Sequence, residues 1–387
     1  ENPFDASNQP IVFTVADPSG SHDWNFGDGT TDIGTTVSHT FPVPVFGGTV
    51  PYLVDHTIGH SGNYDSTVVI LNIVNPLPSE NLHRVIYSST LGGYIGVGDN
   101  AFVVTSPDGT NWTPQNIGGL DLYDVVDNGS LLVAVGAEGT VATSADGTNW
   151  AFPSTGMPTT GEDGTYSLAS VIWDGTQFVT CCSLDAYPYG TSFYISADSS
   201  TWALSDGTLS NIGFGQIVQF DGGYYVGGMN NVDYTTSFYF STDRTSWAPE
   251  SPAIPGFTVR RFNIVNGQLF GCGAFVSCSI DAGIFVRTAP GSFSKLTLLP
   301  AFSIFGSVID IAPLTSAVKH YSTIQKLLTQ QNILDTTDLS TWSMQSITGV
   351  SGQLLNMCYN SGLYVATSSD AKIYNSSDAS SWTQVFG

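Results

Sequence analysis

Two segments of the chain combine aromatic and polar side chains in a way that suits sugar recognition. The first reads SLDAYPYGTS (183–192) and the second reads MNNVDYTTS (229–237). Tyrosine rings stack on sugar faces while Asn and Asp side chains hydrogen-bond hydroxyl groups, as in loop-built recognition surfaces in general. The alternative is that the two segments only pack against each other. The candidate ligand-binding residues are Asp185, Tyr187, Tyr189, Asn230, Asn231, Asp233 and Tyr234.

Three other aspartates, Asp121, Asp124 and Asp310, carry the functional groups that glycoside hydrolysis requires. Hydrolysis of a neutral sugar needs two carboxylates that lie about 5–9.5 Å apart. The chain contains 27 Asp and 5 Glu, so carboxylate pairs at this spacing also arise by coincidence. A Ser–His–Asp arrangement has no support beyond the presence of those residue types. We therefore favour binding over catalysis and keep a glycoside hydrolase as the alternative function.

Most of the chain is organised by a repeat of the form Ser/Thr-x-Asp-x-x-x-Trp. The intervals between the Asp residues of successive copies are 38, 52, 45, 95 and 40 residues. The interval of 95 spans two periods, and TAPGSFSK (288–295), with Phe293 at the Trp position, fills the gap. A period of about 40–50 residues indicates a solenoid, a propeller or an array. The six clear copies lie at 106–112, 144–150, 196–202, 241–247, 336–342 and 376–382.

The segments between the copies predict β-strands. An apolar run with small residues precedes each motif, as in YIGVG (94–98), and another strand-like segment such as LYDVVD (122–127) precedes that run. Each unit is therefore expected to hold four short strands, the third running into the motif and the fourth starting at the Trp. Four-stranded units repeated radially form a propeller. We predict seven units over residues 83–387, the fifth and sixth being the least regular.

The six motifs resemble the Asp-box, or bacterial neuraminidase repeat, of sialidase-like seven-bladed propellers. The resemblance covers about the last three quarters of the chain. It implies that the Ser/Thr and Asp side chains bond the amides of a turn between the third and fourth strands of each blade, while the Trp packs between blades. The residues with this structural role are Asp108, Trp112, Asp146, Trp150, Asp198, Trp202, Asp243, Trp247, Asp338, Trp342, Asp378 and Trp382.

The same resemblance places the two candidate binding segments. They would connect the second and third strands of the third and fourth blades, on the face opposite the motif turns, where propellers usually bind ligands. A sialidase-like site also requires three arginines, a Tyr–Glu nucleophile pair and an acid/base Asp. Arg244 lies inside a motif and Arg287 on an outer strand, and the adjacent Arg260 and Arg261 point to opposite faces of a strand, which with Arg84 leaves no triad. The Phe-Arg-Ile-Pro segment typical of sialidases is absent.

Residues 10–75 do not follow the repeat. HDWNFGDGTT (22–31) followed by SHTF (38–41) resembles the PKD domain, an Ig-like β-sandwich marked by W-x-F-G-D-G and a short H-x-Tyr/Phe segment. Trp24 and Phe26 alternate on one face of a strand, and Asp28 begins a tight turn. We favour turn bonding for Asp28 over metal ligation, and a structural role for His39.

Composition excludes several classes of function. Lys and Arg number 9 against 32 Asp and Glu, and the net charge of −23 disfavours binding to nucleic acid or to anionic membranes. No apolar run is long enough to span a membrane. The five Cys form no zinc-like pair, and we expect no metal and no cofactor. No signal-peptide pattern is present, and because residue 1 is Glu we expect a processed or trimmed chain.

These observations predict an all-β chain with a PKD-like sandwich at 1–75, a Pro-containing linker at 76–82 and a propeller at 83–387. We expect a non-catalytic attachment or recognition protein, extracellular or on a virion surface, such as a phage appendage, a capsid decoration protein or a bacterial surface protein. The propeller would bind a surface glycan or surface protein. Residues 1–75 would serve as a spacer or dock onto a capsid, tail or cell-envelope protein. A purely structural role is a third hypothesis.

Overall fold

Apart from one 3-10 turn, every element of regular structure in the described part of the chain is a β-strand, which confirms the all-β prediction. This turn, η1 (Asp99–Ala101), is the sole helical element among the described residues, and no helix there is long and apolar enough to cross a membrane. For part of the strands only the backbone is described. The computed structural model describes residues 4–5, 10–41, 49–61, 63–74, 80–161, 164–184, 190–210, 212–230, 235–255, 257–265, 267–275, 283–289, 292–295, 308–314, 319–326, 330–336 and 342–387.

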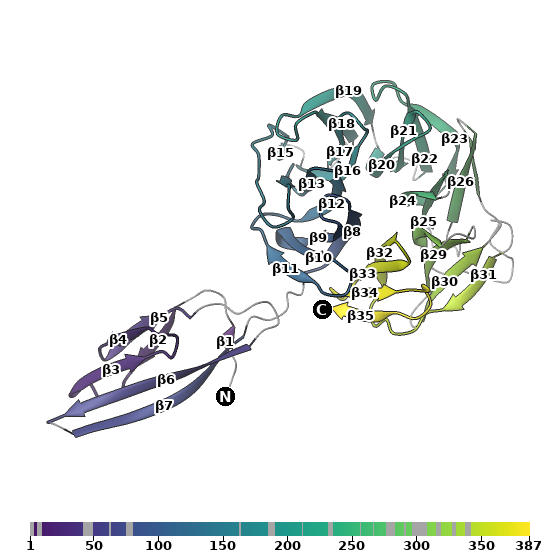
Figure 1. Cartoon of the computed structure of the whole chain (residues 1–387). Helices are drawn as coiled ribbons and strands as arrows, with labels where there is room; N and C mark the ends of the chain where they lie inside the picture. Colours follow the sequence, from purple (N-terminus) through teal and green to yellow (C-terminus); the bar gives the residue numbers. More distant parts are fainter. Residues whose placement is uncertain are drawn as a thin grey trace. The chain divides into compact units, whose positions relative to one another are not determined.

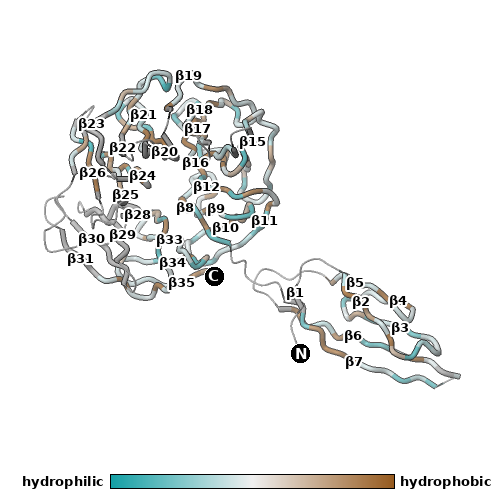
Figure 2. The backbone as a smooth tube through the Cα atoms, turned by 180° about the vertical axis from the view of Figure 1, so that it is seen from behind, coloured by the Kyte–Doolittle hydropathy of each residue, from teal (hydrophilic) through white to brown (hydrophobic). Residues whose placement is uncertain are grey.

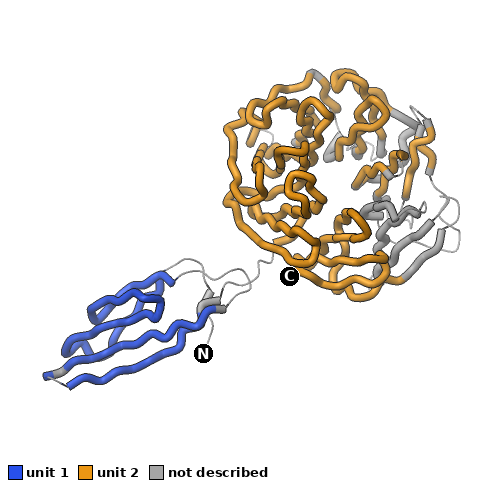
Figure 3. The backbone as a smooth tube through the Cα atoms, in the orientation of Figure 1, with its two compact units in different colours: residues 1–79 blue, residues 80–387 orange. Residues whose placement is uncertain are grey.

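The chain divides into two compact units, Glu1–Ser79 and Glu80–Gly387 (Figure 3). The division falls inside the linker expected at 76–82. Asn81 already belongs to the second unit, because its backbone N–H and its Nδ2 both donate to Oδ2 of Asp99, at 3.1 and 3.0 Å. The first strand of that unit then begins at Leu82.

The first unit contains a five-stranded sheet in the order β1-β7-β6-β3-β4 and a two-stranded sheet β2-β5. Its core lies between the two sheets and is mostly aromatic, with Phe13 of β2 against Trp24 of β3 and against Phe26, which follows that strand, at ring-centroid distances of 5.4 and 5.5 Å. The strands are β1 (Phe4–Asp5), β2 (Ile11–Thr14), β3 (Ser21–Asn25), β4 (Thr31–Ile33), β5 (Thr36–His39), β6 (Thr49–His60) and β7 (Asn63–Val74).

The second unit consists, over its described residues, of seven consecutive antiparallel sheets, here numbered in chain order. Within a sheet each strand pairs with the next one along the chain. The first three sheets comprise β8 (Leu82–Ser88), β9 (Gly93–Gly98), β10 (Phe102–Ser106) and β11 (Thr113–Asn116); β12 (Leu122–Asp127), β13 (Leu132–Gly136) and β14 (Val141–Ser144); and β15 (Thr160–Gly161), β16 (Gly164–Trp173), β17 (Phe178–Leu184), β18 (Gly190–Ser196) and β19 (Ala203–Ser210).

The remaining four sheets have four strands each. They comprise β20 (Ile212–Phe220), β21 (Gly223–Asn230), β22 (Thr235–Ser241) and β23 (Ala248–Pro255); β24 (Phe257–Val265), β25 (Gln268–Phe275), β26 (Gly283–Ala289) and β27 (Ser292–Lys295); β28 (Val308–Leu314), β29 (Lys319–Lys326), β30 (Gln330–Thr336) and β31 (Trp342–Ser346); and β32 (Leu354–Asn360), β33 (Leu363–Ser368), β34 (Ile373–Ser376) and β35 (Thr383–Phe386).

The inner strands of successive sheets, β8, β12, β16, β20, β24, β28 and β32, contact one another in a closed order. They are called first strands below, because only the two-residue β15 precedes one of them within its sheet. Figure 1 shows the sheets around a common centre, with β8, β12, β16, β20, β24 and β32 innermost. The ring closes with a hydrogen bond in which the backbone N–H of Val85 donates to Oδ1 of Asn356 at 2.7 Å. The second strands β9 and β13 are buried along their whole length.

The second sheet differs from the expected four strands. After Trp150 only Ala151 pairs with β14, through a single bridge to Thr143. Pro153 follows two residues later and has no N–H to donate to a ladder, so no fourth strand continues from this point.

Candidate functional site

The repeated motif forms a turn in which two side chains satisfy the backbone. In the first copy the hydroxyl of Ser106 accepts from the N–H of Gly109 at 2.8 Å. Oδ1 of Asp108 accepts from the N–H groups of Thr110 and Asn111, both at 2.8 Å. These hydrogen bonds lower the pKa of Asp108 to about 2, and the one from the backbone N–H of Asn111 has the largest effect.

The other described copies repeat this geometry. The carboxylates of Asp146, Asp198, Asp243 and Asp378 each accept from the two backbone N–H groups that lie two and three residues later. Such bonds lower the pKa of all four carboxyl groups. A carboxylate that already accepts several turn donors has little capacity left for a ligand. Asp338 lies outside the described residues.

The motif tryptophans join neighbouring sheets. Trp202, on the third sheet, packs with Val133 and Val135 of the second, and Trp247 of the fourth sheet stacks on Phe193 of the third with a centroid distance of 4.4 Å. The indole N–H of Trp202 donates to the carbonyl three residues earlier, as those of Trp150, Trp247 and Trp382 also do. The ring of Trp112 packs between the first and seventh sheets. For Trp342 only the backbone, at the start of β31, is described.

Phe293 takes the same place on the fifth sheet. Its ring stacks on Phe238 of β22 at 4.1 Å and 14°, which matches the stacking of Trp247 on Phe193 one sheet earlier. An aromatic ring at this position therefore bridges sheets even where the motif has lost its Trp.

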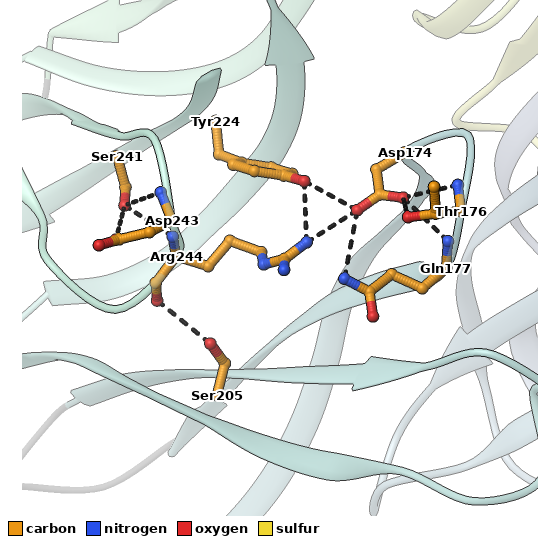
Figure 4. Close-up of polar contacts among 8 residues, drawn as sticks. All are labelled: Asp174, Thr176, Gln177, Ser205, Tyr224, Ser241, Asp243 and Arg244. Atoms are coloured by element: carbon orange, nitrogen blue, oxygen red, sulfur yellow. Dashed lines mark hydrogen bonds and ion pairs between the residues drawn. The ribbon is translucent and has the colours of Figure 1, made fainter. Parts of the chain in front are cut away.

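A buried polar cluster joins the third and fourth sheets (Figure 4). Arg244 lies in the fourth-sheet motif turn, and its Nη1 donates to Oδ2 of Asp174 and to the hydroxyl of Tyr224, both at 2.8 Å. Asp174 belongs to the turn between β16 and β17, and its side chain is 3% exposed. The Tyr224 hydroxyl also donates to Asp174 at 2.8 Å, and the guanidinium lies 4.9 Å from the Tyr224 ring centre.

The cluster is closed by further partners on the third sheet. With the amide oxygen of Gln177 facing Arg244, that oxygen accepts from both Nη atoms at 2.6 and 2.8 Å. The backbone carbonyl of Arg244 accepts from the hydroxyl of Ser205 in β19. Burial raises the pKa of Asp174, but hydrogen bonds from Thr176, Tyr224 and the backbone outweigh it and lower the pKa to about 2. The pair is therefore ionised near neutral pH and locks the two sheets together.

The strands that lead to the predicted binding segments are long. β17, β18 and β22 have 7 residues and β21 has 8, which is longer than β13 and β14 of the second sheet, with 5 and 4. The corresponding strands of the fifth and sixth sheets are equally long, with 8 residues in β25 and β29 and 7 in β26 and β30. The facing ends of the strands that lead to the segments, Leu184 with Gly190 and Asn230 with Thr235, lie opposite the motif turns because successive strands are antiparallel. The candidates Asp185, Tyr187, Tyr189, Asn231, Asp233 and Tyr234 lie outside the described residues, and of Asn230 only the backbone is described.

The first strands share a polar position that the sequence comparison of motifs missed. Asp124, Gln216 and Asn356 each follow a register shift in their strand. Each accepts a backbone N–H from the first strand of the next sheet, namely from Val171, Phe262 and Val85 at 3.0, 2.6 and 2.7 Å. In each of these strands one polar residue is followed by apolar residues, and this recurring sequence pattern could have predicted the shared polar position.

The hydrolase candidates are engaged in the same framework. Asp124 is buried, and Oδ2 accepts from the Ser170 hydroxyl at 2.8 Å as well as from Val171. Its Oδ1 pairs with Nε of Arg84 at 3.2 Å. Asp121 accepts from the N–H of Asn100 at 2.8 Å. The side chain of Asp310 is outside the described residues. Asp124 of β12 thus joins this strand to β16 of the next sheet by hydrogen bonds.

In the first unit, Asp28 and His39 bond each other. Oδ1 of Asp28 accepts from the N–H and hydroxyl of Thr30 at 3.0 and 2.6 Å, while Oδ2 lies 2.7 Å from Nε2 of His39. The His39 ring stacks on Phe26 at 4.0 Å. Among the described residues, no group of three or more His, Cys, Asp or Glu converges on a common point.

Comparison with known proteins identifies the fold of the larger unit. No family model and no curated protein matches the chain. YCF48 from Cyanidioschyzon merolae superposes with a TM-score of 0.55 at 13% identity, covering 78% of this chain and 96% of that one. The Cps50 (Swd1) β-propeller domain of Myceliophteria thermophila gives 0.53 at 9% identity, covering 79% and 97%. The WD40 β-propeller domain of Doa1 gives 0.50 at 12% identity, covering 76% and 91%. Since these structures share the ring of sheets described above, the second unit is a β-propeller.

Proposed function

We propose that this chain is a non-catalytic recognition protein that works at the surface of a virion or a cell, extracellularly. The first unit is a PKD-like, Ig-fold module that acts as anchor or spacer toward a capsid, tail or cell-envelope protein. The second unit is a seven-bladed propeller of the Asp-box type. It presents the segments 185–189 and 231–234 to a surface glycan or a surface protein.

The observation that carries the proposal is the construction of the third and fourth sheets, called blades from here on. In each blade, two long strands (β17 and β18, β21 and β22) end on the same face of the ring. The candidate segments 185–189 and 231–234 connect the ends of these strands. On the opposite face the same two blades are locked by the pair Arg244–Asp174. Side chains on loops held by such a rigid pair lose little entropy on binding, which favours affinity.

The remaining support comes from the sequence resemblances and from the ring. The motif turns bind their own backbone and carry the blade contacts, which fits an Asp-box role, and seven sheets are found among the described residues. The β-propeller structures that this chain resembles make recognition a reasonable role for the fold. Asp124, the central hydrolase candidate, has its oxygens engaged between first strands, and so the binding function is preferred.

The test is adsorption to a glycan array and to candidate host cells, using the full chain and the variant Tyr187→Ala/Tyr189→Ala/Tyr234→Ala. We expect the triple variant to lose at least tenfold in binding, since it removes three stacking rings. Tyr87→Ala is the matched control, because Tyr87 is a partly exposed tyrosine at the end of β8 on the motif-turn face. Binding should also change little between low and moderate salt, because stacking and hydroxyl bonding are less screened than binding to a polyanion. Full binding by the triple variant would move the site elsewhere and favour a purely structural role.

A further inference from the structure

The first unit has a groove between its two sheets. The groove has a volume of about 390 Å³ and is lined by Val12 and Thr14 of β2, by Trp24 and His56, and by Val69 of β7. Val12 is 61% exposed and Val69 54% exposed. The hydrophobic run of β7 can be followed in Figure 2. Apolar side chains of this size that stay open to solvent in one groove mark a site of interaction.

One wall of the groove is the outer edge of β2. In the ladder with β5 the N–H of Val15 donates to the carbonyl of Thr35 at 2.9 Å. Residues of an antiparallel ladder alternate between bonding the partner strand and pointing away from it. Ile11 and Phe13 therefore bond β5, while the N–H and C=O groups of Val12 and Thr14 point to the other edge, where no strand pairs with β2 in the described part of the chain.

The floor of the groove is the inner face of β7. Thr67, Val69 and Leu71 alternate along this strand and all line the groove. A strand added to the edge of β2 would lie above Thr67, Val69 and Leu71. Its inward side chains repeat every two residues, at about 6.6 Å, so about three of them would face these three residues. Peptide groups along one wall and alternating apolar positions along the floor are the two elements that strand addition to a sheet edge uses.

The charge of the unit selects the occupant. Residues 1–79 contain eight Asp and Glu and no Lys or Arg. Asp65 continues the face of Thr67 and Val69 at one end of β7 and is exposed. A second copy of this chain would bring the same negative charge, so self-association through the groove is opposed by repulsion. A segment with cationic side chains gains attraction instead.

We propose that an extended segment of a partner protein, alternating apolar and Lys or Arg residues, adds to the edge of β2 and fills this groove. The apolar residues face Val69 and the rim of Trp24, and the cationic residues face outward beside the acidic surface. This inference rests on the proposed anchoring role of the first unit and names the chemistry of its partner. Because the groove lies wholly within that unit, its test is independent of glycan binding by the propeller.

The experiment measures fluorescence anisotropy of a labelled twelve-residue peptide in which Lys and Val alternate, titrated with the full chain. Val12→Pro removes a donor from the open edge and leaves the ladder to β5 intact, and Val12→Thr is its control. Val69→Lys places a charge in the groove, whereas Val68→Lys adds the same charge to the outer face of β7, where Val68 is 55% exposed. We expect Val12→Pro and Val69→Lys to weaken binding at least tenfold and the two controls to change it less than threefold.

Three results would overturn the proposal. One is equal binding by Val69→Lys and Val68→Lys, which remains informative even if Val12→Pro fails to fold. Another is equal binding of a peptide with Glu in place of Lys, or of one with its Lys and Val residues in two separate blocks. The third is a concentration-dependent dimer in sedimentation that Val69→Lys abolishes, since the occupant would then be a second copy.

Discussion

Replacing Asp174 by Asn should loosen the contact between the third and fourth blades in a way that depends on pH. The substitution keeps an oxygen for the N–H groups of Thr176 and Gln177. It removes the negative charge opposite Arg244. The guanidinium, whose side chain is 18% exposed, then remains cationic beside a neutral amide.

The magnitude follows from the pKa of Asp174. Its fall from 3.8 to about 2 corresponds to about 2 kcal/mol of stability at neutral pH, at 1.36 kcal/mol per pKa unit. Removal of one partner of a buried ion pair costs about 3–5 kcal/mol when none of its hydrogen bonds are kept. Because Asp174→Asn keeps the turn hydrogen bonds, we expect this variant to lose about 2 kcal/mol. Unfolding entropy scales with chain length, so for the second unit we expect the melting temperature to fall by about 3 °C.

The sign of the pH dependence is fixed by the direction of the shift. A carboxyl whose pKa is lower in the folded state stabilises fully above its unfolded pKa and loses this contribution as pH falls through the folded pKa. The difference in melting temperature between wild type and Asp174→Asn should therefore be constant from pH 7 to 5, shrink near pH 3 and vanish only below pH 2.

The assay is scanning calorimetry at pH 7, 5, 4 and 3. Asp221→Asn is the matched control, because Asp221 pairs with Arg287 at 3.1 Å but is 61% exposed. Although the side chain of Arg287 is 7% exposed, the Asp221 carboxylate lies largely in solvent. A pair screened in this way contributes about 0–1 kcal/mol, and this variant should melt within about 1 °C of wild type. The reasoning is refuted if Asp174→Asn melts like wild type at pH 7, or if its deficit persists undiminished at pH 3.

Three further outcomes are expected. Trp202→Ala opens a cavity between the second and third blades and should destabilise by about 3–5 kcal/mol in denaturant titration; an unchanged midpoint with lost ligand binding would contradict its structural role. Gly147→Ala should lower stability by about 1–2 kcal/mol, since Gly147 has φ +72 and an added Cβ would lie 3.1 Å from Leu91; melting at the wild-type temperature would show that Leu91 moves aside freely. Sialosides and common glycans should not be hydrolysed, and turnover that disappears in Asp124→Asn would instead establish the enzyme.

Much of this protein was determined by local sequence. The motif turns are built from bonds between residues two or three apart, such as Ser106 to Gly109, so a short pattern suffices to predict them. The period of the motif and the apolar runs between its copies predicted an all-β chain and a β-propeller, because a short, continuous apolar run is typical of a strand buried on both faces and a period of about 40–50 residues is typical of a propeller.

Tertiary structure alone decided which residues hold the units together. Asp174 and Arg244 lie 70 positions apart and Asn356 bonds Val85 across 271 positions, distances at which sequence gives no sign of pairing. The groove of the first unit likewise depends on how far β2 covers β7. Local bonds form wherever their residues occur, whereas contacts across blades and between sheets exist only after the chain has closed on itself, and that is why only the folded structure shows them.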